Sequence, residues 1–503
     1  MALSAKVVEF TLATSTGNQP VTGVGFQPDL VIILCNGTAG VASGNGFSSL
    51  GAGVSSSSRW VVGQWHNNAS SPSNVSRVTR TDRIIDIPNA DGSATDYQAD
   101  LVSMDANGFT INVGVTGGVG LECAALCLAG SDLEVAVGSF LTGTSTGAGI
   151  TAVSGLSFEP KAVLTMWATT STGVGTSTRQ NLGFASGPSN QWGASGWEAD
   201  NAAMITSHAW HSDRYIDGQT HTADDTDISF DAFTSDGWTH DITAVPASLL
   251  VCYVALGGSA QFYVGNDAQD TSTGPEPTTG VGFEPVALIT NMSLRTTTGR
   301  DTNGDFFFHV GFMDGTTEAG GHVFSEDATA NADTSRGIDS TYSLFAVTDD
   351  ATPTVPAKAS LDTFDSDGFT LNWNAADGTA RLFGFLAIGA AASGGSEYEI
   401  AGAVSFAIDA SATLLEGRAL AGAVAFPLAV SATMLEGRVL AGAASHPLGV
   451  SAAMVLNTHS AISGATTFPM APTAAFESTG EGPSAPASLE RGFVHSLTRA
   501  LAA

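Results

Sequence analysis

The stretch TGVGFQPDLVIILC, residues 22–35, defines the pattern of the chain. A glycine-rich turn leads through Phe26 and a proline into an apolar run that suits a strand covered on both faces. The phrase returns as VSGLSFEPKAVLTMW at 153–167 and as TGVGFEPVALITNM at 279–292. Because self-similarity at a fixed period is typical of tandem domains, we interpret these stretches as the same part of three copies of one module.

A second phrase closes each copy. It places a turn dipeptide before an aromatic residue, which is a hairpin signal, and a final apolar run follows. The three occurrences are MDANGFTINV (104–113), FTSDGWTHDI (233–242) and FDSDGFTLNW (364–373). We therefore expect Phe109, Trp238 and Phe369 to occupy equivalent strands, and likewise the aromatic residues of the opening phrases, Phe26, Phe158 and Phe283.

Composition supports an all-β fold. The 503 residues include 59 glycines, many serines and threonines, and few lysines, which is typical of strands and turns rather than helices. We predict three tandem β-sandwich modules of jelly-roll-like type, at 1–130, 131–258 and 259–390.

A 20-residue period occupies residues 398–478. AGAV at 401–404 and 421–424 is followed by AGAA at 441–444, and apolar residues alternate within each repeat. Prolines within the pattern predict that each repeat breaks into two short strands. Because so short a repeat cannot bury its apolar face alone, it must stack on its neighbours or on identical chains, and we predict the β-repeat stem of a homotrimer.

Residues 479–503 are predicted to form a linker and an amphipathic helix. Its apolar residues recur every four positions, at Leu489, Phe493, Leu497 and Leu501. An apolar stripe on a terminal helix favours docking into a partner's groove, with bundling inside a trimer as the alternative.

An Arg-x-Ile-Asp phrase recurs in the middle of each copy. Its charged residues are Arg83 and Asp86, Arg214 and Asp217, and Arg336 and Asp339. We favour a structural role, in which arginine and aspartate pair across a bend while isoleucine faces the core. The alternative is a ligand contact that is used three times.

Charge and cysteine usage exclude several classes of function. The formal charge of −31 with few bases argues against a nucleic-acid partner. The cysteines lie in apolar runs, so we expect free buried thiols, neither a disulfide nor a zinc site. Neither a signal-peptide core nor an apolar stretch that could insert into a membrane is present, which predicts assembly in a cytoplasm. The cysteines are Cys35, Cys123, Cys127 and Cys252.

A search for catalytic motifs finds no nucleophile elbow and no phosphate loop. We therefore predict a protein that is not an enzyme and uses no cofactor or metal. Residues 301–305 have the oxygen spacing of a calcium loop, but Phe312 stands where a glutamate is required, which favours an ordinary turn.

The opening GVGFQPDLV and the closing SDGFTL, with the final apolar strand, resemble a repeat module of tail-associated virion proteins of tailed bacteriophages. The resemblance covers residues 1–390, although copy two departs from it at Ser157 and at Trp238. It implies a structural or receptor-binding component of the virion, as a tail fibre, spike or capsid decoration, assembled in the host cytoplasm. The implied partners are other virion proteins and a host-surface glycan.

Two functional expectations accompany this resemblance. Glycan binding would use tryptophans in glycine- and serine-rich loops as stacking platforms, and the candidates are Trp60, Trp65, Trp192, Trp197 and Trp210. The alternative is a tailspike-like glycosidase, which needs two carboxylates, with Glu198 beside Trp197 as a candidate. We expect residues 479–503 to anchor the protein and 1–390 to project outward, with the reverse polarity as the rival.

Overall fold

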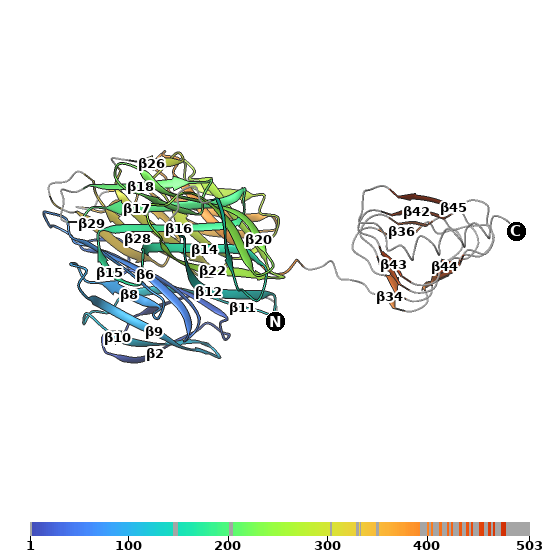
Figure 1. Cartoon of the computed structure of the whole chain (residues 1–503), viewed down its shortest axis with the longest axis horizontal. Coiled ribbons are helices and arrows are strands. Elements are labelled where there is room, and N and C mark those ends of the chain that lie inside the picture. Colours follow the sequence, from blue (N-terminus) through green and yellow to red (C-terminus); the bar gives the residue numbers. More distant parts are fainter. Residues whose placement is uncertain are drawn as a thin grey trace. The chain divides into compact units, whose positions relative to one another are not determined.

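The computed structural model describes residues 3–392, with gaps, and beyond them only the strands β34–β45. The gaps are 144–148, 201–204, 302–303, 328–330, 332 and 349–351. The chain divides into two compact units, Met1–Ala392 and Ser393–Ala503. Strands make up all regular structure of the described part (Figure 1), where no helix could cross a membrane. The predicted all-β class is therefore confirmed.

The first unit contains three sets of strands, one from each sequence copy. Copy one supplies β1 (Ser4–Thr11), β2 (Gly17–Thr22), β3 (Leu30–Cys35), β4 (Ala42–Ser43), β5 (Gly46–Ser55), β6 (Ser58–His66), β7 (Val75–Arg80), β8 (Ile85–Pro88), β9 (Thr95–Asp105), β10 (Gly108–Val115) and β11 (Glu122–Ala129). Copy two supplies β12 (Leu133–Leu141), β13 (Gly149–Ser154), β14 (Pro160–Thr169), β15 (Gly173–Thr176), β16 (Thr178–Gly187), β17 (Asn190–Glu198), β18 (Thr206–His211), β19 (Ile216–Gln219), β20 (Asp224–Thr234), β21 (Gly237–Ala244) and β22 (Leu250–Gly258). Copy three supplies β23 (Gln261–Ala268), β24 (Gly274–Thr279), β25 (Pro285–Met292), β26 (Gly299–Asp301), β27 (Phe306–Met313), β28 (Glu318–Ser325), β29 (Thr334–Asp339), β30 (Leu344–Ala346), β31 (Ala357–Asp365), β32 (Gly368–Ala375) and β33 (Leu382–Gly389).

Each copy is a sandwich of a seven-stranded sheet and a four-stranded sheet. In copy one the large sheet runs β1-β11-β3-β5-β6-β7, with a seventh strand from another copy, and the small sheet runs β2-β10-β9-β8. Copies two and three repeat both orders, and the pairs within them are antiparallel. Phe109, Trp238 and Phe369 each stand second in β10, β21 and β32, fully or almost fully buried, so their predicted equivalence is confirmed.

A glycine in each copy lies where the two sheets approach each other closely. The central strands β5, β16 and β27 each carry one, and a Cβ there would overlap a carbonyl oxygen of the chain that enters the small sheet. The distance from such a Cβ to the carbonyl oxygen would be 2.0 Å for Gly51 and Ile84, 1.6 Å for Gly183 and Tyr215, and 1.7 Å for Gly311 and Ser343. A side chain at these positions would force the sheets apart.

The apolar run of β3 is covered on both faces, as its sequence predicts. Alternate residues point to opposite faces of a strand. Leu30, Ile32 and Leu34 belong to a core that all three copies share, which we call the shared core. Val31 and Ile33 belong to the core between the two sheets of copy one. The second cover of each large sheet therefore comes from the other copies and not from the sandwich itself.

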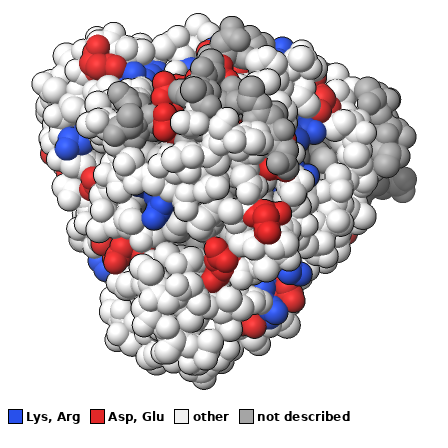
Figure 2. All heavy atoms as spheres, turned by 90° about the vertical axis from the view of Figure 1, so that its left-hand side faces the viewer, with Lys and Arg blue, Asp and Glu red and all other residues white. Residues whose placement is uncertain are grey.

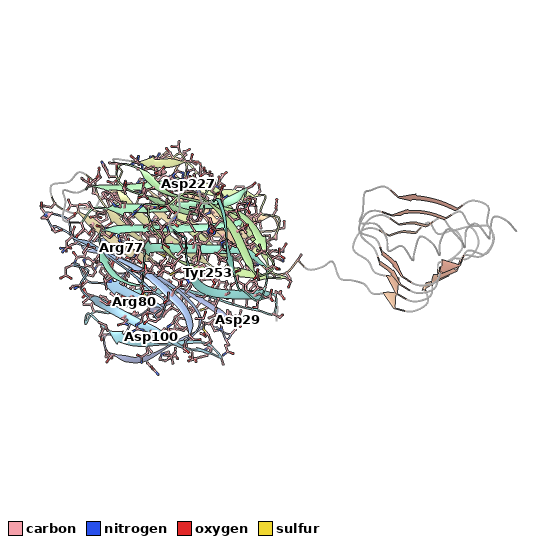
Figure 3. All side chains as sticks on the ribbon, viewed as in Figure 1. Asp29, Arg77, Arg80, Asp100, Asp227 and Tyr253 are labelled. Atoms are coloured by element: carbon pink, nitrogen blue, oxygen red, sulfur yellow. A yellow bond between two sulfur atoms is a disulfide. The ribbon has the colours of Figure 1, made fainter. Side chains whose placement is uncertain are left out.

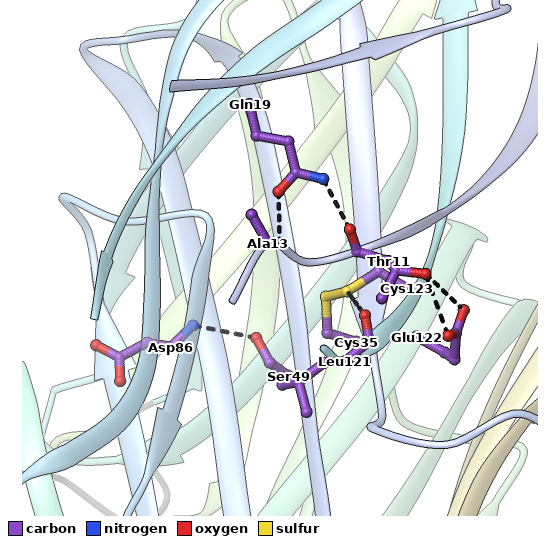
Figure 4. Close-up of a disulfide and its surroundings, with 9 residues drawn as sticks. All are labelled: Thr11, Ala13, Gln19, Cys35, Ser49, Asp86, Leu121, Glu122 and Cys123. Carbon is purple, nitrogen blue, oxygen red and sulfur yellow. Dashed lines mark hydrogen bonds between the residues drawn. A yellow bond between two sulfur atoms is a disulfide. The ribbon is translucent and has the colours of Figure 1, made fainter. Parts of the chain in front are cut away.

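A disulfide joins Cys35 to Cys123 (Figure 4). The prediction of four free thiols is therefore wrong for this pair, while Cys127 and Cys252 are free and buried. The two half-cystines are 88 residues apart in sequence, but β3 and β11 are adjacent strands whose register sets them opposite each other. The disulfide could therefore be predicted only from the pairing of β3 with β11.

In the second unit, the strands of each repeat stack on those of the next repeat of the same chain. Its strands form three parallel four-stranded sheets, in which each strand pairs with the corresponding strand of the next repeat (Figure 1). The first sheet contains β34 (Ile400–Ala401), β37 (Leu420–Ala421), β40 (Val439–Ala441) and β43 (Ala461–Ser463). The second contains β35 (Val404–Ser405), β38 (Val424–Ala425), β41 (Ala444–Ser445) and β44 (Thr466–Thr467). The third contains β36 (Ala412–Leu414), β39 (Ala432–Met434), β42 (Ala452–Leu456) and β45 (Ala474–Ser478).

We call this unit the solenoid. Each repeat contributes three strands, not the two predicted from the prolines. Of the two stacking modes expected, the described strands use neighbouring repeats of the same chain. The predicted helix with Leu489, Phe493, Leu497 and Leu501 lies outside the described residues.

Candidate functional site

Three sets of contacts join the copies of the first unit, and the first set is an exchange of strands. Each copy places a short strand at the edge of another copy's large sheet. β15 of copy two pairs with β7 of copy one, β26 of copy three pairs with β18 of copy two, and β4 of copy one pairs with β29 of copy three. The exchange is therefore cyclic, from each copy to the preceding one.

Polar side chains repeat the same cycle. The first residue of β7, β18 and β29 donates its backbone N–H to an oxygen two residues past the end of a strand in the next copy. The pairs are Val75 with Asp200 Oδ1 (3.1 Å), Thr206 with Asp327 Oδ1 (2.8 Å), and Thr334 with Asn68 Oδ1 (3.0 Å). Because these donor N–H groups lie outside the register with the exchanged strands, the side-chain acceptors satisfy donors that the sheet leaves open.

A third set of contacts joins the hairpin turns of one copy to the first strand of the next. Ser58 Oγ of copy one donates to Val137 O (2.8 Å), and Val264 N of copy three donates to Ser186 Oγ of copy two (2.9 Å). Val7 N donates to Asp314 Oδ2 (2.7 Å), to which Lys6 also forms an ion pair. This last pair joins copy one to copy three, which no peptide connector links directly.

These three sets define a closed ring of three copies, each using different surfaces towards its two neighbours. That is the geometry of a cyclic heterologous interface, which closes at three members. We call residues 3–392 the ring.

The copies carry different residues at the last position of the equivalent strands β6 and β17. His66 of copy one and Glu198 of copy two, the last residues of β6 and β17, lie 2.5 Å apart, and both are fully buried. The ring of Phe306 from copy three packs against the His66 ring in a tilted contact, with the ring centroids 4.4 Å apart. The carboxylate that sequence suggested for glycan hydrolysis is thus enclosed in the interface between copies, out of reach of a polysaccharide.

The Arg-x-Ile-Asp phrases are not equivalent in all copies. Asp86 and Asp217 stand second in β8 and β19, but Arg336 and Asp339 lie in β29 of a large sheet. The predicted repeat is therefore wrong for copy three, where the sequence match is coincidental.

Only copy two forms the predicted pair, with Arg214 Nη1 at 3.8 Å from Asp217. In copy one Arg83 pairs with Asp82 and Asp100, and Arg80 pairs with Asp86 (3.4 Å). Arg336 lies over the ring of Phe47 at 4.2 Å, in the contact between copies three and one.

Asp217 lies in a charged cluster of copy two. Its Oδ2 accepts a hydrogen bond from the Ser195 hydroxyl (2.5 Å), and its Oδ1 lies 3.9 Å from His211 Nε2. Burial raises the pKa of the Asp217 carboxyl to about 6, and burial likewise raises the pKa of Asp86 to about 6. Arg300, carried by the exchanged strand β26, pairs with Asp224 of the same cluster (3.2 Å). The cluster therefore ties the exchanged strand of copy three to copy two.

Among the described residues, no group of three or more histidine, cysteine, aspartate or glutamate side chains is placed to hold a metal ion.

The tryptophans proposed as stacking platforms are mostly internal. Trp60, Trp192 and Trp210 are fully buried in the shared core, and Trp192 stacks on Trp210 at 4.9 Å. The prediction is therefore wrong for these three, because their apolar surface holds the copies together. Trp65 is buried in the core of copy one, where it stacks on Phe47, so the prediction is wrong for it as well. Trp197 is partly buried beside His221.

A surface hollow of about 630 Å³ lies where copy one meets copy two. Phe26, Ala129, Leu133 and Val135 form its apolar wall, and Gln27, Asp29 and Ser131 supply polar groups. Figure 3 places Asp29 at the lower right of the ring, well away from Asp227 of the copy-two cluster. We call this hollow the copy-one cleft.

The cleft follows from one substitution between copies. In copies two and three a glycine, Gly257 or Gly389, stands opposite the aromatic residue, and a Cβ there would lie 2.6 or 2.3 Å from its ring. Phe158 and Phe283 consequently pack down and are buried. In copy one the residue is Ala129, and Phe26 stays partly exposed beside the hollow.

Charged groups are dispersed over the surface. Figure 2 shows one face on which acidic and basic side chains stand singly or in small groups among uncharged ones. The described residues on this face form no basic cluster of the kind that binds nucleic acid.

A scan of protein-family models finds none that matches the chain, and a search of curated proteins finds no similar sequence.

Sequence comparison of the copies missed two features that it could have found. The acceptors Asn68, Asp200 and Asp327 each follow the same strand end by two residues, so aligning HNN, EAD and SED would have indicated a repeated polar contact. The replacement of glycine by Ala129 at the end of an apolar run was the corresponding signal for the cleft.

Proposed function

We propose that this chain is a non-enzymatic structural and attachment protein of a tailed-bacteriophage particle, of the tail-fibre, spike or decoration kind. The ring of three copies carries the proposal. Its shared apolar core and its recurring polar contacts serve cohesion between copies, as expected of a component that must resist dissociation. The short phrases shared with tail-associated virion modules supply the class of particle, with other virion proteins as partners.

Host attachment is assigned to the copy-one cleft. The partly exposed ring of Phe26 offers a face for the CH groups of a sugar, and the Asp29 carboxylate and Gln27 amide offer hydrogen-bonding groups beside it. The acidic chain disfavours anionic polysaccharides, so the ligand class is a neutral glycan. The proposal also includes anchoring of the protein by residues 479–503 and assembly of the chain as a homotrimer.

Mass spectrometry of purified particles tests the virion assignment. Particles from a lysate of host cells that carry this gene should contain the chain at constant copy number after density-gradient purification. Recovery of the chain only in the soluble fraction would overturn the assignment.

Binding and hydrolysis are separated by one pair of assays on the purified full chain. Calorimetric titration with neutral surface polysaccharide of the host should show binding that Phe26→Ala weakens at least tenfold, while Phe158→Ala, in the closed position of copy two, leaves it unchanged. Reducing-sugar release from the same polysaccharide would establish the alternative, a glycan-degrading tail enzyme. Equal binding by wild type and Phe26→Ala would remove the cleft from the proposal.

A further inference from the structure

We infer that the ring is a trimer encoded in one chain: the surface through which each copy contacts its neighbours is a protomer interface, and the partner that fits it is another copy of the same module. This goes beyond virion attachment and does not depend on it.

The first observation is that a single copy cannot cover its own apolar surface. The large sheet of copy one sends Leu34, Leu50 and Trp60 into the shared core, where residues of copies two and three cover them. Each copy separately has its own internal core between its two sheets. An isolated copy would keep its internal core but expose a contiguous apolar face, which soluble monomers rarely do.

The second observation is that the contact without a peptide connector matches the two contacts that have one. Copies one and three share the exchanged strand β4, the Asn68 acceptor and the Asp314 turn, in the same three roles as at the other two contacts. The peptide connectors therefore do not create the interface, because the same interface forms where none is present.

The third observation is the convergence of the copy ends. Leu3, Leu133 and Ala260, which lie at the starts of the three copies, are all buried in the shared core. The two connectors touch there, since Ala260 N donates to Asp132 O (2.8 Å). Ala390, at the end of copy three, packs against the same core. The end of copy three thus lies in the region where the other two copies are joined to their successors.

Circular permutation of the full chain tests this inference. The permutant runs from 131 to 390, continues through a Ser-Asp linker into 3–130, and ends with 391–503, so the copies follow the order two-three-one. The matched control carries the same segments and linker lengths in the order one-three-two, which reverses the cycle. We expect the permutant to unfold cooperatively within a few degrees of wild type whatever the control does, because the interface does not depend on the connectors. Loss of cooperative unfolding in the permutant would overturn the inference.

Cleavage of the connectors provides an independent readout. Protease sites inserted at Ser131 and Ser259, the exposed residues of the two connectors, allow all three copies of the full chain to be separated covalently after folding. We expect the cleaved copies to co-elute as one species on size exclusion at nanomolar concentration. Release of free copies on dilution would show that the connectors hold the ring, and would refute the inference.

A variant at the contact between copies sharpens this second experiment. A Cβ at Gly384 of copy three would lie 2.3 Å from the indole of Trp192 in copy two, whereas a Cβ at Gly187 would meet nothing within 4 Å. In the cleaved protein, Gly384→Val should release copies that Gly187→Val retains. Equal retention in both variants would place the cohesion outside the interface described above and would contradict the inference.

Discussion

Copies one and two bury an aspartate where copy three buries an aromatic ring. Asp86 and Asp217 stand second in β8 and β19, and Phe345 stands second in β30. Around Asp217 lie Ser195, His211 and Arg214, whereas Phe345 presents its ring to His309 and His322 at 4.8 and 5.4 Å. The same place in one fold is thus filled by a carboxylate with polar partners or by an apolar contact.

The difference teaches that the fold does not require a charge at this position. It requires a side chain that fills the space and neighbouring groups that match that side chain. The ionisable groups at this position and beside it also respond to acid in opposite directions. Burial raises the pKa values of both aspartates, which favours protonation in the folded state. Burial lowers the pKa of His322 to about 3 and that of His309 well below its usual value, which disfavours protonation in the folded state.

Transfer of the aspartate into copy three should have the largest effect. Phe345→Asp removes a buried ring and introduces a carboxylate where copy three has Asp339 in the strand position of Arg80. We expect the free energy of unfolding to fall by at least about 4 kcal/mol, against about 1 kcal/mol for the control Phe345→Leu. Chemical denaturation measures both. Equal losses would mean that the site accepts a charge without a partner.

Acid titration should have the next largest effect. The unfolded chain protonates His322 near pH 6.5 and the folded chain only near pH 3, so stability is complete above pH 6.5 and falls as the pH is lowered. His322 alone contributes a loss of about 3 kcal/mol by pH 4. Two further histidines of copy two, His208 and His240, have pKa values lowered to about 4 by burial and act in the same direction.

Thermal unfolding between pH 7 and pH 4 checks this effect. His322→Gln should flatten the decline, while Ser335→Ala, which removes the hydroxyl beside the His322 ring (3.3 Å) and keeps the imidazole, should retain it. A decline of the same size in His322→Gln would assign the acid sensitivity to other groups.

Sequence predicted the parts of the fold that depend on local patterns. The repeated phrases predicted the three sandwiches, and the continuous apolar run at 31–35 predicted a strand covered on both faces. The sequence could not identify what covers the second face of this strand, because burial by another copy and burial within a sandwich require the same apolar residues. The tryptophans were misplaced for this reason, since an aromatic residue in a Gly/Ser-rich segment suits a loop and an interface core equally.

Features that depend on register were invisible for a different reason. The disulfide requires Cys35 and Cys123 to lie opposite each other in adjacent strands, and composition carries no information on that pairing. The third Arg-x-Ile-Asp phrase matched in letters but falls in a different sheet. Candidate sites were therefore predicted less well than the fold.

The smallest and most discriminating effect is expected at Asp217 itself. Its folded-state pKa of about 6 lies above the value of 3.8 in the unfolded chain, so its contribution to stability is complete below pH 3.8 and is lost as the pH rises through 6. Ionised Asp217 thus costs about 3 kcal/mol at pH 7 relative to the neutral acid, because desolvation outweighs its charge contacts with His211 and Arg214.

Asp217→Asn keeps an acceptor for the Ser195 hydroxyl and cannot ionise. We expect a gain of about 1–3 kcal/mol at pH 7 and none at pH 4. Asp217→Ala serves as the control and should destabilise at both pH values, because Ser195 loses its acceptor. A loss of stability in Asp217→Asn at pH 7 would show that the ion pairs of copy two stabilise it, and that the apolar contact of Phe345 is not an equivalent solution.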